Sequence, residues 1–346
     1  MELLKRLTET PGAPNQEFRI SQIVTEALQG YPVEITQDCN GSLIVHRPPV
    51  SGRKDALRVV MDAHMDEPSF IVTKIYPDGL LGFFDHGGPD ENCVANESVW
   101  VGNDLIPGLI IKPDPASINH AEFRIDIGAS SGEEAAQYVQ IGDVINFHAQ
   151  AKELDNGWMI SKAFDDRAGC YAMIELMKNS YDVDLYAVFA VQEETGIRGA
   201  RCAKYLEPDI NINFEATGTA QIPGIPENLN NAIVGQGPVV FIQDFTFMLH
   251  DEFRRYISRC GKAAGIPFQF RGMCVGGSDA GAYYSAGDGV ATSVIAVPHY
   301  NCHGPISMAC LEDVKNIVAL GDAVLQNLSE DGKNWLEKIN RGEAVQ

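Results

Sequence analysis

Five α/β elements of this 346-residue chain place a carboxylate or an imidazole at the end of an apolar strand or in the loop after it. Short apolar runs that alternate with amphipathic helical segments predict a mostly parallel sheet covered by helices. The carboxyl ends of such strands meet at one edge of the sheet, where open α/β sheets bind their ligands. The residues at these ends are His64 and Asp66, the pair Asp165 and Asp166, the pair Glu193 and Glu194, Glu215, and His303.

Each of these residues also has an ordinary structural explanation. Two acids before a helix can cap it and favour its dipole, as at Asp165 and Asp166. The paired glutamates can form a solvated first turn of a helix, Glu215 can end a strand, and His303 can belong to a turn before Gly-Pro. All of these explanations would have to coincide at one sheet edge. We therefore expect a functional site there.

A bound metal ion would offset the repulsion between the paired acids. Histidine, aspartate and glutamate together offer mixed nitrogen and oxygen donors, which suit Zn²⁺ and also Co²⁺ or Mn²⁺. One carboxylate can bridge two ions about 3.5–4 Å apart in hydrolytic sites. Neighbouring side chains on a strand face opposite sides, so one of Glu193 and Glu194 can hold metal while the other faces an attacking water. A carboxylate beside a dication stays ionised, as a general base requires.

The pattern of apolar and polar residues divides the chain into two domains. Residues 1–68 and 156–346 have the pattern of alternating strands and helices that is typical of an α/β domain. We expect helices over 2–10 and 15–30 and a strong closing helix over 308–328. Residues 69–155 contain short β-like runs separated by Gly, Pro, Asp and Asn, which predict a β-rich insert, a barrel or a sandwich.

Composition excludes several partners and compartments. The formal net charge of −21 disfavours nucleic acid and anionic membranes, both of which need basic patches. The chain lacks an apolar stretch of transmembrane length and an N-terminal signal peptide pattern. Its eight cysteines form no C-x-x-C pair and no disulfide framework. We therefore expect a cytoplasmic protein that binds neither nucleic acid nor membrane.

Six motifs, in order, resemble those of the tetrahedral (TET) aminopeptidases, in the glutamyl-aminopeptidase and endoglucanase-like group of dinuclear metallopeptidases. The resemblance covers residues 3 to 328 and rests on "LTETPGAPNQE", "DAHMDEPSFIV", "FDDRAGC", "VQEETGIRGA", "GGSDAGA" and "HGP". It implies a three-layer α/β/α zinc-peptidase sandwich interrupted by a PDZ-like β-domain. It also implies that the substrates are short peptides and that the protein is a homo-oligomer. In this assembly the insert would make the subunit contacts, and dimers would combine into a tetrahedral shell of twelve subunits.

The resemblance assigns a role to each candidate residue. His64 and Glu215 would hold a first metal ion, and Glu194 and His303 a second. One of Asp165 and Asp166 would bridge the two ions, with Asp165 chosen, and the peptide bond between them would be cis. Glu193 would be the general base and Asp66 an acid close to the first metal. We expect Gly277, Ser278 and Asp279 of "GGSDAGA" to contact substrate.

Two departures from the family pattern concern the ligands. Glu215 stands where the family usually has aspartate, and its extra methylene should make the first site the weaker one. Tyr300 and Asn301 precede "CHGP" in place of the usual arginine and tyrosine. His299 and Cys302 are extra potential ligands, for which we expect structural roles.

Three functions are compatible with these residues. The leading hypothesis is a dinuclear metallo-aminopeptidase that removes N-terminal residues from short peptides. A related metal-dependent amidohydrolase or deacylase on a small acylated substrate is the first alternative. The second is a catalytically silent scaffold, against which the retained Glu193 argues.

Overall fold

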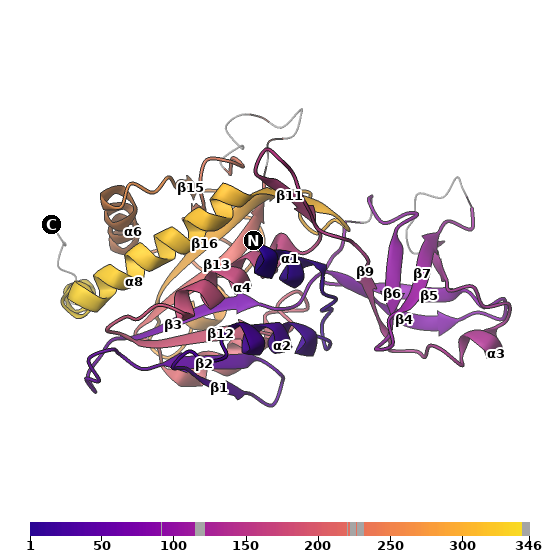
Figure 1. Ribbon diagram of the computed structural model, residues 1–346, viewed down its shortest axis with the longest axis horizontal. Helices are drawn as coiled ribbons and strands as arrows, with labels where there is room; N and C mark the ends of the chain where they lie inside the picture. Colours follow the sequence, from indigo (N-terminus) through magenta and orange to yellow (C-terminus); the bar gives the residue numbers. More distant parts are fainter. Residues whose placement is uncertain (91, 115–121, 220, 222–225, 227–231, 341–346) are drawn as a thin grey trace.

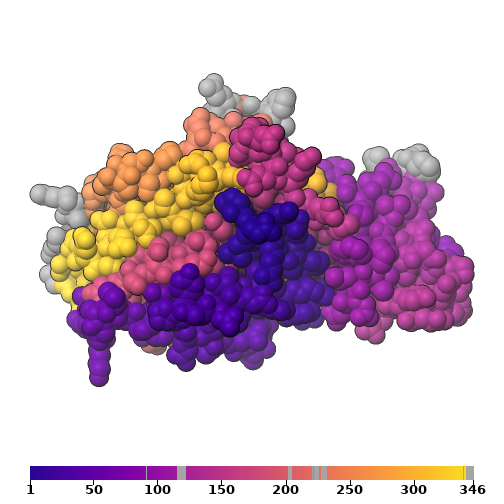
Figure 2. Space-filling view, in the orientation of Figure 1, coloured from indigo at the N-terminus to yellow at the C-terminus, as the bar shows by residue number. Residues whose placement is uncertain are grey.

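The computed structural model describes residues 1–90, 92–114, 122–219, 221, 226 and 232–340. A large α/β unit holds both ends of the described chain, and a smaller β unit projects from one side of it (Figure 1). In the space-filling view the smaller unit forms a separate lobe, coloured purple to magenta (Figure 2).

The α/β unit is built on a mixed sheet whose parallel part is its centre. Four adjacent strands are parallel, and their order is β12 (Asp184–Ala190), β3 (Arg58–His64), β13 (Ile210–Gly218) and β16 (Ala291–Tyr300). The strands that flank them are joined mostly by antiparallel pairs, so the sheet is less parallel than the sequence suggested. The flanking strands are β1 (Glu34–Gln37) and β2 (Leu43–Arg47) on one side, and β17 (Ser307–Cys310), β11 (Trp158–Ser161), β10 (Lys152–Glu153), β14 (Val239–Phe241) and β15 (Gln269–Arg271) on the other.

Helices cover both faces of this sheet. Alternate side chains of a strand point to opposite faces, and Met61 of β3 packs in one buried cluster while Val60 packs in another. The Met61 face is covered by α1 (Glu2–Glu9), α2 (Phe18–Ala27), α4 (Phe164–Met177), α6 (Asp251–Ala263) and α8 (Leu311–Asn340), and the Val60 face by α5 (Arg198–Ala203) and α7 (Ala280–Tyr284). A 3₁₀ turn over Lys204–Leu206 follows α5. The expected three-layer α/β/α arrangement is therefore confirmed.

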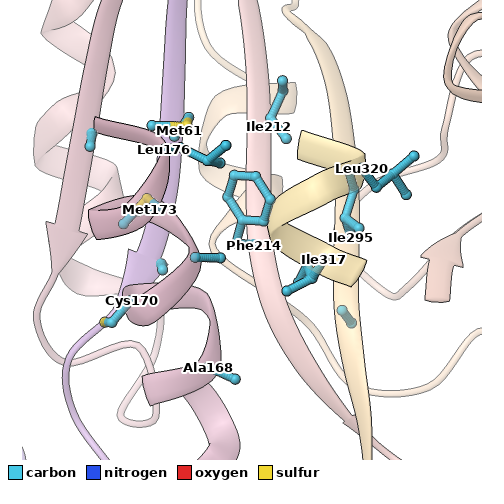
Figure 3. Close-up of a cluster of buried hydrophobic side chains, with 14 of the residues drawn as sticks. Met61, Ala168, Cys170, Met173, Leu176, Ile212, Phe214, Ile295, Ile317 and Leu320 are labelled. Atoms are coloured by element: carbon cyan, nitrogen blue, oxygen red, sulfur yellow. The ribbon is translucent and has the colours of Figure 1, made fainter. Parts of the chain in front are cut away.

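The main core lies between the sheet and the pair α4 and α8. Phe214 of β13 points between these helices, beside Leu176 of α4 and Ile317 of α8 (Figure 3). A Cβ atom on Gly321 would lie only 2.8 Å from the Phe214 ring, so the missing side chain lets α8 approach the sheet. Helix α8 runs beyond the expected 308–328, and its buried Trp335 packs against α6.

The β unit is a closed antiparallel barrel inserted between β3 and β11. Its strands, in spatial order, are β4 (Ser69–Ile75), β5 (Leu81–His86), β8 (Arg124–Asp126), β7 (Ile106–Ile111), β6 (Ser98–Val101) and β9 (Val144–Phe147), and a short helix, α3 (Gly132–Ala135), lies at its rim. The barrel has its own buried core, which includes Phe70, Val99 and Ile145. The expected β-rich insert is thus a six-stranded barrel, and β10, from the end of the expected range 69–155, pairs with the large sheet.

The chain has no helix, among its described residues, that combines the length and the apolar character needed to cross a bilayer.

Candidate metal centre

The structure brings the candidate ligands together at the carboxyl ends of the parallel strands. His64 is the last residue of β3, and Glu215 lies in the carboxyl-terminal half of β13. Glu194 follows β12, and His303 lies in the turn between β16 and β17. Ligand atoms of His64, Asp165 and Glu194 all lie within 4.8 Å of one another, as do those of Asp165, Cys302 and His303.

Asp165 lies between the two histidines and offers one oxygen to each. Its Oδ1 atom is 3.1 Å from Nε2 of His64, and its Oδ2 atom is 3.6 Å from Nε2 of His303. Glu215 Oε2 lies 3.7 Å from the same His64 nitrogen, and Glu194 Oε2 lies 3.6 Å from that of His303. The five side chains thus form two adjoining groups that share Asp165.

The start of α4 places Asp165 in this position. Ala163 has a positive φ of 52°, and the Asp165–Asp166 peptide bond is cis, as expected. Asp166 is fully buried, and its carboxylate accepts backbone N–H groups of His64 at 3.2 Å and of Gly169 at 3.0 Å. Asp166 therefore joins the end of β3 to α4, while Asp165 faces both histidines.

Asp66 connects the first histidine to the loop that carries the paired glutamates. Its buried carboxylate accepts the backbone N–H groups of Glu193 at 2.9 Å and of Glu194 at 3.1 Å. The Nδ1 atom of His64 lies 3.2 Å from the Asp66 carbonyl oxygen, so an Nδ1 proton would be held there and Nε2, which faces Asp165, would be the nitrogen that binds a metal.

The inserted barrel orients the second histidine. The Nδ1 atom of His303 lies 3.0 Å from the carbonyl oxygen of Gly88, just after β5, so its Nε2 is also left free to bind metal. The next residue back, Gly87, touches Glu194, since a Cβ atom there would lie 2.7 Å from the Glu194 Cβ. This contact was not predicted from the sequence, although adjacent glycines such as those of "HGGP" permit a close approach.

Burial and mutual repulsion perturb the acids of the centre. Burial raises the pKa of Glu193 to about 7, and it raises the pKa values of Glu194 and Glu215 well above their ordinary range. Burial opposes protonation of His64, but Asp165 and Asp66 raise its pKa well above the ordinary value. The Oε1 atom of Glu194 is buried without a hydrogen-bond partner among the described residues. Several buried carboxylates close together, one of them with an unpaired oxygen, form a site that is suited to divalent cations.

A cavity of about 680 Å³ opens over these side chains. Glu193 lines it together with His64, Asp165, Glu194, Glu215 and His303. Gly277 also lines it, and its contact with substrate stays a prediction. Ser278 and Asp279 are fully buried, and the Ser278 hydroxyl donates to Asp244 Oδ2 at 2.7 Å.

Two further residues beside the centre differ in their access to it. Cys302 lines the cavity, and its sulfur lies 3.3 Å from Asp165 Oδ2. His299 is buried, and burial lowers the pKa of its ring. Arg271 also lies in the cavity wall and was not among the residues predicted from the sequence.

The mixed sheet, the inserted barrel and the His–Asp–Glu groups define the class of metal-dependent hydrolases. The model of the M42 glutamyl aminopeptidases matches residues 41–320. The chain belongs to this family and is a metal-dependent aminopeptidase, a hydrolase of peptide bonds.

Relatives across the whole chain agree with this assignment. The chain is 32% identical to a putative aminopeptidase of Acetivibrio thermocellus, over 92% of this chain and 96% of the relative. It is 30% identical to the lysyl aminopeptidase of Pyrococcus furiosus, over 94% of this chain and 97% of the relative.

Solved structures show the same fold. Aminopeptidase APDkam598 of Desulfurococcus kamchatkensis superposes with a TM-score of 0.92 at 28% identity, over 100% of this chain and 98% of that chain. The TET1 peptidase of Pyrococcus horikoshii, which can assemble into a tetrahedron or a large octahedral shell, gives a TM-score of 0.83 at 26% identity, over 94% and 98% of the two chains.

Proposed function

We propose that the chain removes N-terminal residues from short peptides with two divalent metal ions per subunit. His64, Asp165 and Glu215 would hold the first ion, and Asp165, Glu194 and His303 the second. The observation that carries this proposal is the position of Asp165, which offers a separate oxygen to each histidine at 3.1 and 3.6 Å. A shared carboxylate between two groups of ligands is the arrangement that two-metal hydrolysis needs.

The donor types decide which metals fit. Each group combines one imidazole nitrogen with carboxylate oxygens, a set that suits Zn²⁺ best and also accepts Co²⁺ or Mn²⁺. Glu215 is longer than an aspartate by one methylene, and we propose that this makes the first site the weaker of the two.

Glu193 is the proposed general base. When bound, the metal ions polarise the scissile carbonyl and lower the pKa of a water at the site. The carboxylate of Glu193 accepts a proton from the attacking water and returns it to the leaving amine. Asp66 would position Glu193 by accepting a hydrogen bond from the Glu193 backbone N–H, and it would orient His64, two residues earlier in the chain, through its own carbonyl oxygen.

We propose that the chain works as a homo-oligomer assembled through the barrel, with the tetrahedral dodecamer as its complete form. The shells built by the Pyrococcus horikoshii relative support this proposal. The barrel also exposes large apolar side chains that a partner subunit could cover, namely Phe84, Tyr138 and Ile141. Free thiols on all seven described cysteines suit a reducing compartment, so we propose the cytoplasm.

A panel of aminoacyl-p-nitroanilides, with Zn²⁺, Co²⁺ or Mn²⁺ added to metal-stripped protein, tests this function. We expect metal-dependent release of p-nitroaniline from substrates with a free amino group, and none from N-acetylated versions of the same substrates. Release of acetate from the N-acetylated substrates, with no p-nitroaniline released from those with a free amino group, would indicate a deacylase, and no hydrolysis of either would indicate a silent scaffold.

A further inference from the structure

The cavity over the metal centre contains one sulfur atom among its described lining residues, that of Cys302. Cys302 lies in the turn between β16 and β17, directly before the proposed ligand His303. Its Sγ atom lies 3.3 Å from Oδ2 of Asp165. This is the oxygen that faces His303, whereas Oδ1 of Asp165 faces His64. The sulfur therefore lies with the side chains that are proposed to hold the second ion.

A close glycine contact and a hydrogen-bonded turn fix the position of this thiol. An added Cβ atom on Gly218, the last residue of β13, would lie 3.1 Å from the Cys302 Cβ, so the bare glycine makes room for the cysteine. The turn is closed by two hydrogen bonds to the Asn301 carbonyl, from the Gly304 backbone N–H and the Ser307 hydroxyl, each at 3.0 Å. A donor that the fold already holds in place loses little freedom when it binds a metal.

The distances between these side chains match those between the ligands of one zinc ion. Zinc binds sulfur at about 2.3 Å and nitrogen or oxygen at about 2.0–2.2 Å in a tetrahedral arrangement, which places its ligands about 3.3–3.7 Å apart. The distance from Cys302 Sγ to Asp165 Oδ2 is 3.3 Å. The Nε2 atom of His303 lies 3.6 Å from Asp165 Oδ2 and 3.6 Å from Glu194 Oε2. Three edges of a tetrahedral site are therefore present.

An unpaired carboxylate oxygen in the same group points independently to a cation. The side chain of Glu194 is only 4% exposed, and its Oε1 atom has no hydrogen-bond partner in the described part of the chain. The thiol of Cys302 does not supply that partner, because its hydrogen bond goes to Asp165. A buried carboxylate oxygen without a partner is costly, and a metal ion held between these side chains removes that cost.

We propose that Cys302, as a thiolate, is the fourth ligand of the second metal ion. This inference rests on the proposed function, which supplies the other three ligands. When the metal binds, a metal–sulfur bond forms, the S–H bond breaks and the proton leaves to solvent. Four protein ligands make a closed tetrahedral site, and a thiolate favours Zn²⁺ over Mn²⁺, which prefers oxygen donors. The second site is therefore selective for zinc.

X-ray absorption at the zinc edge tests this inference, because it reports the ligand atoms directly. The natural protein, loaded with two equivalents of Zn²⁺, should show one sulfur for every two zinc ions, at about 2.3 Å. Cys302→Ser should lose this sulfur signal, although its hydroxyl can still donate to Asp165. Protein loaded with Co²⁺ should show a thiolate-to-cobalt charge-transfer band in the near ultraviolet, and Cys302→Ser should lose that band as well.

Cys310→Ser is the matched control, because Cys310 is also a half-buried free thiol and lies at the end of β17, outside the cavity. This variant should keep the sulfur signal. Calorimetric titration of metal-stripped Cys302→Ser should show one Zn²⁺ equivalent weakened by at least about 100-fold, since disturbing only the support of a ligand already costs about 10- to 100-fold. The affinity for Mn²⁺ should fall far less.

Three outcomes would overturn the role of Cys302 and leave the proposed function intact. They are zinc surrounded only by nitrogen and oxygen in the natural protein, a sulfur signal that survives in Cys302→Ser, and an equal loss of Zn²⁺ and Mn²⁺ affinity in that variant. The last result would assign the thiol a structural role through its hydrogen bond to Asp165. Sulfur-bound zinc in a protein that cleaves no aminoacyl-p-nitroanilide would instead support the inference and overturn the proposed function.

Discussion

Replacing Gly87 with alanine tests whether the inserted barrel positions a metal ligand. Gly87 has φ +85°, and an added Cβ would lie 2.7 Å from the Glu194 Cβ. Carbon atoms in ordinary contact are about 3.5–4.0 Å apart, so Glu194 must move by about 1 Å. Gly142 is the matched control, since it lies in the same insert with φ +96° and has no atom within 4 Å of an added Cβ.

The two variants share a backbone cost and differ in the contact with Glu194. A left-handed conformation costs a residue with a side chain about 1–2 kcal/mol, so denaturant unfolding should show a similar loss in both. Only Gly87→Ala should weaken metal binding at the group of Asp165, Glu194 and His303, by roughly 10- to 100-fold, which is the usual effect of disturbing a ligand's support. Calorimetric titration of stripped protein with Zn²⁺ measures this. Equal metal affinity in the two variants and the natural protein would refute the coupling.

Three further predictions concern the first metal site, the assembly and the buried core. Glu215→Asp should bind the first metal at least as tightly as the natural protein, and Glu215→Ala should lose one equivalent and keep the other; loss of both by calorimetry would contradict the ranking of the sites. Phe84→Glu on the barrel surface should dissociate the oligomer in light scattering, and a natural protein that is monomeric and fully active would contradict the assembly. Lys162 is buried, and its Nζ atom lies 2.6 Å from each carboxylate oxygen of Glu67. Lys162→Met should therefore lower the free energy of unfolding by about 3–5 kcal/mol. A loss below about 1 kcal/mol would contradict a structural role for this pair.

The strand-end residues could be predicted because their signal is local. An apolar run that stops at a polar residue marks both the strand and the edge to which that residue is delivered, as at His64 and Glu215. The barrel was also predictable, because the sequence changes there from long helical patterns to short β-like runs separated by turn residues. The antiparallel strands on the β14 side of the sheet were not, because a fully buried strand such as β14 has the same continuous apolar pattern in either direction.

The features of the site that could not be predicted depend on contacts between segments that are far apart in the sequence. The contact of Gly88 with His303 joins residues 215 positions apart, and no periodicity in the chain encodes it. Arg271 enters the cavity wall only because β15 pairs with β14, which pairs in turn with β16. Asp279 lies two residues after the cavity-lining Gly277 in the sequence, yet its own side chain is fully buried.

Glu193→Gln tests the central claim most directly, because it separates metal binding from proton transfer. Glutamine fills the same volume but cannot accept the proton of the attacking water. The variant should keep two metal equivalents by elemental analysis after dialysis and lose at least about 100-fold in kcat on an aminoacyl-p-nitroanilide. Loss of either metal ion would make Glu193 a ligand, and natural turnover with full metal content would remove it from the reaction.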